Sequence, residues 1–273
     1  IPNIRELKRF DAWKRPYSMH GIRGGGGEDQ LKFLRNCCGE ESLMKFQGED
    51  LFARSCQRNG ELGYGPIETE FLSCFIATKR PRRIVQIGCG VSTAVILAAA
   101  EKTEYRPTIT CIEPFPTTFL VEAAKKGEIE LISKRAQSVE MSTLTDLGEG
   151  GFLFVDSTHT VSPGSEVNQI ILEVLPRLDA GQWVHFHDIF FPYGYTRSLL
   201  TNQLFFSNET NLLYSFLLQN EKYRLGVALS MMHYLEPKAL KGLFPQYSPS
   251  GNDAGLSTSR GDFPSSTYLE VLR

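Results

Sequence analysis

The chain has 273 residues, of which 41% are apolar, enough for one sizeable α/β domain with appendages or at most two small domains. Its 29 Lys and Arg residues nearly balance its 31 Asp and Glu residues, and the net charge of −2 gives no preference for nucleic acid or another polyanion. No apolar run reaches the ~18–20 residues that a membrane-spanning helix needs, so we expect no membrane partner.

The six cysteines include no C-x-x-C pair, and Cys89 and Cys111 fall in apolar segments that are predicted to be core strands. This usage is typical of reduced thiols rather than of a disulfide framework. Because no secretory signal is visible either, we expect a cytoplasmic protein.

The first part of the chain, residues 1–62, is less regular and is predicted to be a helical N-terminal extension or lid. Helices are expected near 4–13, 29–38 and 50–58. The four glycines at 24–27 have too little steric restriction to hold one conformation by themselves. They form either a linker or a loop that becomes ordered over a ligand.

Residues 63–273 are predicted to form one domain in which strands and helices alternate. Such alternation indicates a mostly parallel sheet with helices on both faces, so we expect a Rossmann-like, doubly wound, seven-stranded α/β fold. Ligands then collect at the carboxyl ends of the strands. The expected strands are 83–87, 108–113, 129–132, 151–155, 182–187, 223–230 and 266–271, and the expected helices lie near 67–78, 91–102, 117–126, 138–144, 165–176, 211–220 and 237–243, with a surface loop at 246–265.

The first of these strands ends in a glycine turn, Gly88-Cys89-Gly90, and an Ala-rich helix follows at once. The glycines let a ligand approach the backbone, and the free N–H groups of the helix's first turn face it. The next strand ends in Glu113, 23 residues after Gly90, where a carboxylate can accept both hydroxyls of a ribose.

This turn lacks a dinucleotide motif's third glycine, because Thr93 stands in that place. With Ser92 following the turn, the pattern fits S-adenosylmethionine better than a dinucleotide. A plain turn whose glycines only relieve crowding stays the alternative.

Two further strands end in ionisable residues, Asp156 after one and His187 with Asp188 after the other. If the strands are neighbours, these side chains converge at the same edge as the glycine turn. Two carboxylates and an imidazole can hold a divalent ion and leave positions for a substrate. The nitrogen ligand favours Mn, Fe or Zn, and Mg stays open.

Two more histidines accompany this cluster. His159 lies one short turn past Asp156, as a fourth ligand or a general base, and His185 shares a strand face with His187. The alternative for each is a hydrogen-bonded structural histidine. Asp156 is a candidate for catalysis and for cofactor contact as well.

Weaker candidates flank these motifs. Glu68, in a helix start after Tyr64, would belong to a lip over the cofactor, or serve only as an ordinary helix N-terminus. Ala136 and Gln137 would meet an adenine ring, or merely turn the chain. The aromatic segment 189–195 would wall a substrate pocket, or pack over the sheet edge.

The order of motifs, with V-D-S-T-H at 155–159 and H-F-H-D-I at 185–189, resembles class I S-adenosylmethionine-dependent methyltransferases. Bacterial relatives near the catechol, caffeoyl-CoA and macrolide-sugar O-methyltransferases are the most similar. The resemblance runs from about 65 to 195, with a looser match over 266–272.

The resemblance implies roles for individual residues. It implies that the glycine turn carries the methionine part of the cofactor, Glu113 the ribose, and Ala136 with Gln137 the adenine. It implies a metal at Asp156, His187 and Asp188. The sequence departs from the pattern at Gln86, where an acid is usual, and at His187, where a carboxylate is usual.

We therefore expect methyl transfer from S-adenosylmethionine to an oxygen of a small-molecule substrate, assisted by a divalent metal, with His159 or His185 taking the proton. One alternative is a metal-dependent oxygenase or hydrolase on the same fold, because a histidine with two carboxylates is close to the non-haem iron set. Another is a non-catalytic domain, supported only by Gln86. A homo-oligomer is compatible with the sequence.

Overall fold

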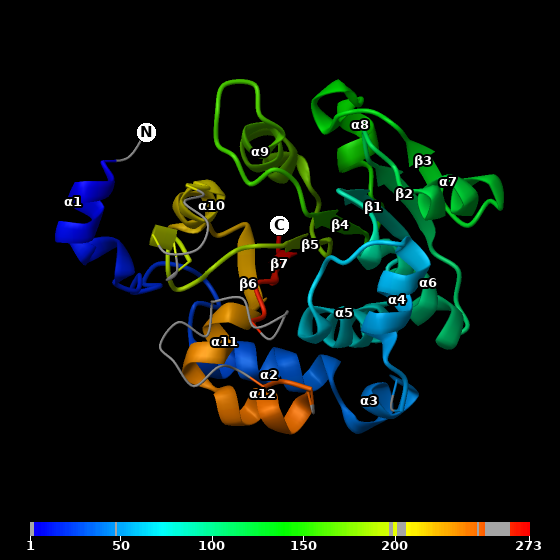
Figure 1. The fold of residues 1–273 in the computed structure, drawn as a ribbon, viewed down its shortest axis with the longest axis horizontal. Coiled ribbons are helices and arrows are strands. Elements are labelled where there is room, and N and C mark those ends of the chain that lie inside the picture. Colours follow the sequence, from blue (N-terminus) through cyan, green and yellow to red (C-terminus); the bar gives the residue numbers. More distant parts are fainter. Residues whose placement is uncertain (1–2, 47, 197–198, 201–205, 245, 249–262) are drawn as a thin grey trace.

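The computed structural model describes residues 3–46, 48–196, 199–200, 206–244, 246–248 and 263–273 (Figure 1). Its centre is a seven-stranded sheet with the order β3-β2-β1-β4-β5-β7-β6. All pairings are parallel except those of β7, which runs antiparallel to both neighbours. The predicted Rossmann-like sheet is thereby confirmed. The strands are β1 (Arg83–Ile87), β2 (Thr108–Ile112), β3 (Glu130–Ile132), β4 (Phe152–Val155), β5 (Trp183–Phe186), β6 (Tyr223–Ala228) and β7 (Thr267–Val271).

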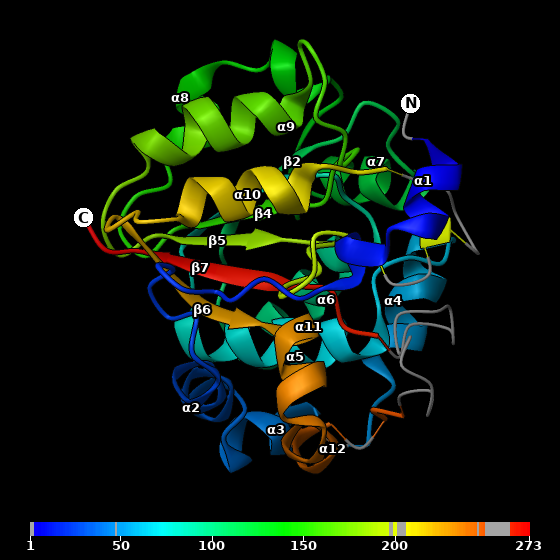
Figure 2. The same ribbon diagram turned by 90° about the vertical axis from the view of Figure 1, so that its left-hand side faces the viewer.

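Helices cover both faces of the sheet (Figure 2). One face carries α8, α9 and α10, and the other carries α2 and α5. The helices beyond the N-terminal part are α5 (Pro66–Lys79), α6 (Val91–Lys102), α7 (Thr118–Lys125), α8 (Met141–Thr145), α9 (Glu166–Gln169), α10 (Glu209–Leu217), α11 (Leu229–Leu235) and α12 (Pro237–Leu243).

The central strands are apolar on both sides because both faces are covered. All four side chains of β4 are buried, and so are those of β5. α6 is apolar around most of its circumference because it packs against α4 and α5 as well as the sheet, and Val95 and Ile96 are fully buried. This packing holds the glycine turn between β1 and α6 in a fixed place.

The N-terminal part is helical, as predicted, with α1 (Ile4–Arg9), α2 (Gly27–Cys37), α3 (Glu40–Phe46) and α4 (Leu51–Asn59). It shares one hydrophobic core with the rest of the chain, to which it contributes Leu34 and Cys56. The fully buried Gln30 accepts a hydrogen bond from the backbone N–H of Ala228 at 3.0 Å. The domain boundary at 62 stays a prediction, and the packing is continuous across it.

The glycines at 24–26 lie in a turn beside the edge strand β6, and Gly27 begins α2. The N–H of Leu225 in β6 donates to the carbonyl of Arg23 at 2.9 Å. None of these glycines lines the cavity at the glycine turn, as the described residues define it. This segment therefore packs against β6 just before α2, away from the glycine turn at 88–90.

Three elements differ from the expectation. α3 was not predicted, and the predicted strand 223–230 ends at Ala228, where α11 begins. The predicted helix 165–176 starts as α9 and continues as a π-helical turn at Ile170–Val174 and a 3₁₀ turn at Leu175–Arg177. Most of the predicted loop 246–265 lies outside the described residues.

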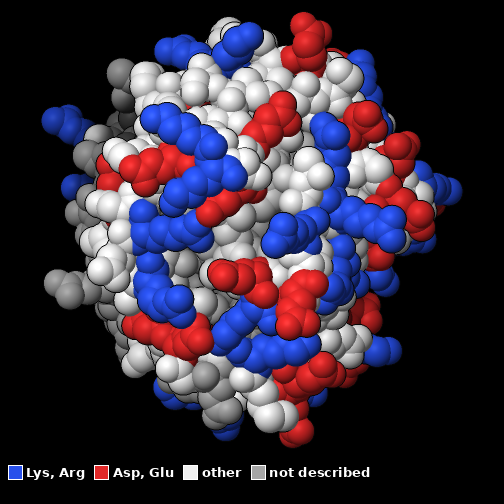
Figure 3. All heavy atoms as spheres, turned by 90° about the vertical axis from the view of Figure 1, so that its right-hand side faces the viewer, with Lys and Arg blue, Asp and Glu red and all other residues white. Residues whose placement is uncertain are grey.

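The surface of the face in Figure 3 carries acidic and basic side chains interspersed with one another. In the part of the chain that the structure describes, no helix is both long enough and apolar enough to cross a bilayer.

Candidate active site

The glycine turn packs directly on the end of the neighbouring strand. Gly88 has φ +81°, and a Cβ atom at this position would lie 1.7 Å from the carbonyl oxygen of Asp156. Its N–H donates to the carbonyl of Ile112 at 3.1 Å. Only glycine fits such a conformation and such a close approach, so the turn brings the ends of β1, β2 and β4 together.

A cavity of about 290 Å³ opens at this turn. It lies close to the lower end of the size range of small-molecule sites. The structure brings together here the predicted residues Gly88, Cys89, Gly90, Ser92, Glu113 and Asp156. Tyr64, from the predicted lip, also lines this cavity.

Glu113 anchors the acidic side of this cavity. Its carboxylate accepts hydrogen bonds from the N–H of Cys89 at 3.3 Å and from the N–H of Phe115 at 2.9 Å. A carboxylate has about four acceptor sites, so two stay available for the hydroxyls of a ribose. This arrangement fits the part of S-adenosylmethionine that the sequence assigned to Glu113.

Asn59 is a pocket residue that sequence reasoning missed. It is the last residue of α4, and its Oδ1 accepts a hydrogen bond from the hydroxyl of Thr117 at 3.0 Å. A polar residue before the helix-ending Gly60 is ordinary, so no local pattern distinguished Asn59. The N-terminal part therefore contributes directly to the cavity.

Three predicted cofactor residues lie outside the lining of this cavity, as the described residues define it. Ala136 is buried, and the amide of Gln137 donates to Glu166 at 3.0 Å. Glu68 is buried in the first turn of α5, where its carboxylate accepts the N–H of Ser265 at 2.8 Å. Their cofactor roles stay predictions.

Gln86, which stands where the resembling enzymes have an acid, is fully buried. Its amide donates to the hydroxyl of Ser92 at 3.3 Å. It therefore ties β1 to the first turn of α6 without presenting a charge.

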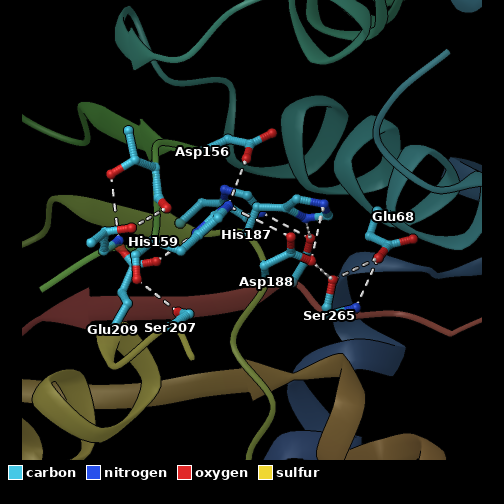
Figure 4. A network of polar contacts seen from close by, with 12 residues as sticks. Glu68, Asp156, His159, His187, Asp188, Ser207, Glu209 and Ser265 are labelled. Atoms are coloured by element: carbon cyan, nitrogen blue, oxygen red, sulfur yellow. Dashed lines mark hydrogen bonds and ion pairs between the residues drawn. The ribbon is translucent and has the colours of Figure 1, made fainter. Parts of the chain in front are cut away.

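A second group of ionisable side chains lies beside the cavity (Figure 4). The ring of His159 donates from Nδ1 to Glu209 Oε2 at 2.7 Å. Its Nε2 lies 3.6 Å from Asp156 Oδ1 and 3.6 Å from Asp188 Oδ2. The contacts continue from Asp188 to Ser265, whose hydroxyl donates to Asp188 at 2.8 Å. Asp156 belongs both to this group and to the cavity.

The acids around His159 determine its charge. Burial by itself lowers the pKa of His159, but the hydrogen bond and charge of Glu209 and the charges of Asp188 and Asp156 raise that pKa to about 9. Burial raises the pKa of Asp156, and the charges of His187 and His159 oppose that rise. The ring of His159 therefore carries a positive charge at neutral pH in the absence of ligands.

The predicted metal ligands do not meet as a metal site in this arrangement. His187 Nε2 lies 3.6 Å from Asp188 Oδ1, and Nε2 of His159 lies 3.6 Å from a carboxylate oxygen of Asp156 and of Asp188. Among the residues that the structure describes, no three His, Cys, Asp or Glu side chains are arranged to hold a metal ion. The metal at these residues therefore stays a prediction.

His185 lies in the core of the sheet. It is fully buried, and its ring stacks on Phe154 with 4.1 Å between the ring centroids. Its Nε2 shares a hydrogen bond with the hydroxyl of Ser266 at 2.9 Å. Burial and the charge of His187 hold the pKa of His185 well below its usual value, so the ring is neutral. The structure thus places the ring of His185 in the core. The hydroxyl of Tyr64, which lines the cavity, lies 3.5 Å from Nε2 of His185. The proton-transfer role of His185 stays a prediction.

Two rings of the aromatic segment after β5 contact the helices α10 and α11, and both alternatives for this segment stay predictions. Phe191 is fully buried, and Tyr193 packs on Tyr234 with 4.9 Å between ring centroids.

Comparison with known proteins adds a family match. Residues 85–189 match the family model described as a methyltransferase domain. The chain is similar to the methyltransferase PaMTH1 of Podospora anserina, solved with S-adenosylhomocysteine bound, at 16% identity and a TM-score of 0.49, over 86% of this chain and 97% of that one. It is also similar to the plantazolicin methyltransferase BpumL in complex with S-adenosylhomocysteine, at 14% identity and a TM-score of 0.41, over 90% of this chain and 99% of that one. No curated protein matches the sequence.

The matched residues run from the middle of β1 to just past β5, and they include the glycine turn, Glu113 and Asp156. Residues 85–189 are thus similar to a methyltransferase domain, and they lie in a sheet of Rossmann-like order with a cavity at the glycine turn.

Proposed function

We propose that this enzyme transfers the methyl group of S-adenosylmethionine to an oxygen of a small molecule. The observation that carries the proposal is the position of Asp156, which lines the cofactor cavity and lies 3.6 Å from Nε2 of His159. A donor in the cavity and an acceptor hydroxyl beside His159 would therefore meet at Asp156. Holding the two reactants in this way lowers the barrier through proximity and orientation.

In this scheme His159 accepts the proton of the acceptor hydroxyl at Nε2. The oxygen then uses the freed electron pair to form a bond to the methyl carbon, and the bond from that carbon to sulfur breaks with its electrons remaining on sulfur. The products are the methyl ether or ester and S-adenosylhomocysteine, and the proton passes from His159 to solvent.

The raised pKa of His159 sets when this base is available. With a pKa of about 9, the neutral ring becomes more abundant as the pH rises toward 9. A positively charged sulfonium beside Asp156 would disfavour the imidazolium and so lower the pKa of His159 toward neutrality. Cofactor binding would thereby favour the form that accepts the proton.

The predicted metal at Asp156, His187 and Asp188 is not used in this scheme, because no three potential ligands are grouped as a metal site among the described residues. The donor types still suit Mn, Fe or Zn, so a metal requirement stays a prediction. Activity that falls when a chelator is added and returns when Mn²⁺ is supplied would support a metal requirement.

A small-molecule acceptor is favoured over nucleic acid by the balanced charge of the chain and by the mixed charges on the face in Figure 3. The cytoplasmic location predicted from the six thiols, and a homo-oligomer, stay part of this proposal.

The function is tested by incubating the purified chain with S-adenosylmethionine and a panel of hydroxylated small molecules. S-adenosylhomocysteine release is measured, and mass spectrometry with NMR locates the methyl group on the product. We expect methyl ethers or esters, and we expect them to disappear in Asp156→Ala. Products methylated only on nitrogen or carbon would refute the oxygen acceptor.

A further inference from the structure

The backbone of His159 has an uncommon conformation that a distant segment supports. Its φ is +58°, in the left-handed region that residues other than glycine seldom adopt. Its carbonyl accepts a hydrogen bond from the hydroxyl of Ser207 at 2.7 Å. Such conformations persist where the surroundings hold them, and they gather at functional sites.

The same segment also holds the ring of His159. Glu209 is the first residue of α10 and is only 1% exposed, and its Oε2 accepts the Nδ1–H of His159 at 2.7 Å. Figure 4 shows Ser207 and Glu209 on one side of His159, with Asp156 on the other. Backbone and ring of His159 are thus both fixed from residues 207–209, about fifty positions later in the sequence.

A buried carboxylate is costly unless a charged or hydrogen-bonding partner compensates for its lost hydration. Among the described residues, His159 is the hydrogen-bond partner of Glu209, and the second carboxylate oxygen, Oε1, has none. A glutamate whose only task was to begin α10 could remain at the surface, where it favours a helix N-terminus equally well. Its burial against the ring therefore indicates a role directed at His159.

We propose that Glu209 is a positioning residue, which holds the ring of His159 so that Nε2 faces the space between Asp156 and Asp188, where the acceptor would lose its proton. This inference rests on the proposed function, in which His159 is the base. Because Nδ1 donates to Glu209, the lone pair of the neutral ring lies on Nε2. Without the carboxylate, the ring can rotate or place its proton on Nε2, and it then loses the base where the acceptor needs it.

The first test requires no acceptor. Long-range ¹H–¹⁵N NMR of the histidine rings, recorded above pH 9 so that His159 is neutral, identifies the nitrogen that carries the proton. We expect Nδ1–H in the wild type and a large fraction of Nε2–H in Glu209→Gln. An unchanged tautomer in a folded Glu209→Gln protein would overturn the proposal.

Glu166 provides the matched control. It is also a buried glutamate at the first residue of a helix, and it accepts the N–H of Thr158 at 2.9 Å, but it does not bond to the ring of His159. Glu166→Gln should leave the tautomer of His159 unchanged. An equal change in both variants would mean that the ring responds to general loosening of the site, which also contradicts the proposal.

The second test uses the acceptor found in the screen. We expect Glu209→Gln to lower kcat by about 10²-fold or more, in the range of a lost general base, while KM for the acceptor changes little. Glu209→Asp keeps a carboxylate and should recover part of kcat, which also serves if Glu209→Gln folds poorly. Two results would contradict a positioning role. One is a rise in KM as large as the fall in kcat in both Glu209 variants, and the other is full activity in Glu209→Gln.

The role of His159 as the base and the role of Glu209 in positioning its ring are tested separately. If His159→Asn stays fully active, the proposed base is wrong, whereas the tautomer measurement still decides whether Glu209 sets the ring.

Discussion

Gly88 and Asp156 end adjacent strands so closely that a Cβ atom on Gly88 would lie 1.7 Å from the carbonyl oxygen of Asp156. The glycine turn and the ionisable group beside it are therefore parts of one rigid edge of the sheet. A change that displaces the backbone at one of these two residues must also displace the other.

Gly88→Ala should be severely destabilising. The change adds left-handed strain and forces the end of β4 away, so we expect a loss of more than about 2 kcal/mol in the free energy of unfolding, together with loss of S-adenosylhomocysteine binding. Urea unfolding and calorimetry measure the two effects. Gly150→Ala is the control, because φ there is +65° but a Cβ atom meets nothing within 4 Å, so only about 1 kcal/mol of strain is expected. Equal effects of the two substitutions would contradict the close packing.

The pH dependence of activity should follow His159. Its pKa is raised from the usual 6.5 to about 9 by Glu209, Asp188 and Asp156 against the opposing effect of burial, so the base form increases as the pH rises. We expect kcat/KM for the acceptor to rise with pH and level off at or below about 9. A rate that falls as the pH rises from 6 to 9 would exclude His159 as the base.

The same shift makes a prediction about stability. A group with a raised pKa in the folded state stabilises fully below the unfolded value, near 6.5, and this stabilisation is lost as the pH rises through about 9. The free energy of unfolding should therefore decrease between these pH values by more in the wild type than in His159→Asn. Identical pH profiles for the two proteins would show that the ring is not held as an imidazolium.

His185 should contribute to stability rather than to proton transfer. Its ring is buried and neutral on Phe154, so His185→Ala leaves a cavity, and we expect a cost of about 2–4 kcal/mol, similar to that of other large-to-small core changes. The folded fraction should bind S-adenosylhomocysteine with the wild-type Kd. A normally stable variant with no turnover would instead assign His185 a chemical role.

The sequence predicted the sheet well because its signals there are local. Apolar runs of strand length, a glycine turn and a closing acid each depend on neighbouring residues, and Gly88, Glu113 and Asp156 all line the cavity. The boundary at Ala228 was missed because the apolar residues that follow suit a strand and a helix equally. There the hydroxyl of Ser230 donates to the carbonyls of Ile189 and Phe191, a long-range contact that no local pattern contains.

The polar group at the site was only partly predictable for the same reason. Asp156 and Asp188 follow strands, and their meeting could be inferred from parallel pairing. Glu209 and Asn59 come from helices α10 and α4, where a glutamate at the start and an asparagine at the end are ordinary. Only the packing of α10 shows that Glu209 reaches His159 where an ion had been expected.

The measurement that tests the central claim most directly is calorimetric titration with S-adenosylhomocysteine of the wild type, Glu113→Ala and the control Glu101→Ala, which changes an exposed acid on α6. We predict a Kd near micromolar for the wild type and the control, and at least about tenfold weaker binding, equivalent to 1.4 kcal/mol, for Glu113→Ala. No binding at millimolar ligand to the folded wild type, or the same Kd in all three proteins, would contradict the placement of the methyl donor at the glycine turn.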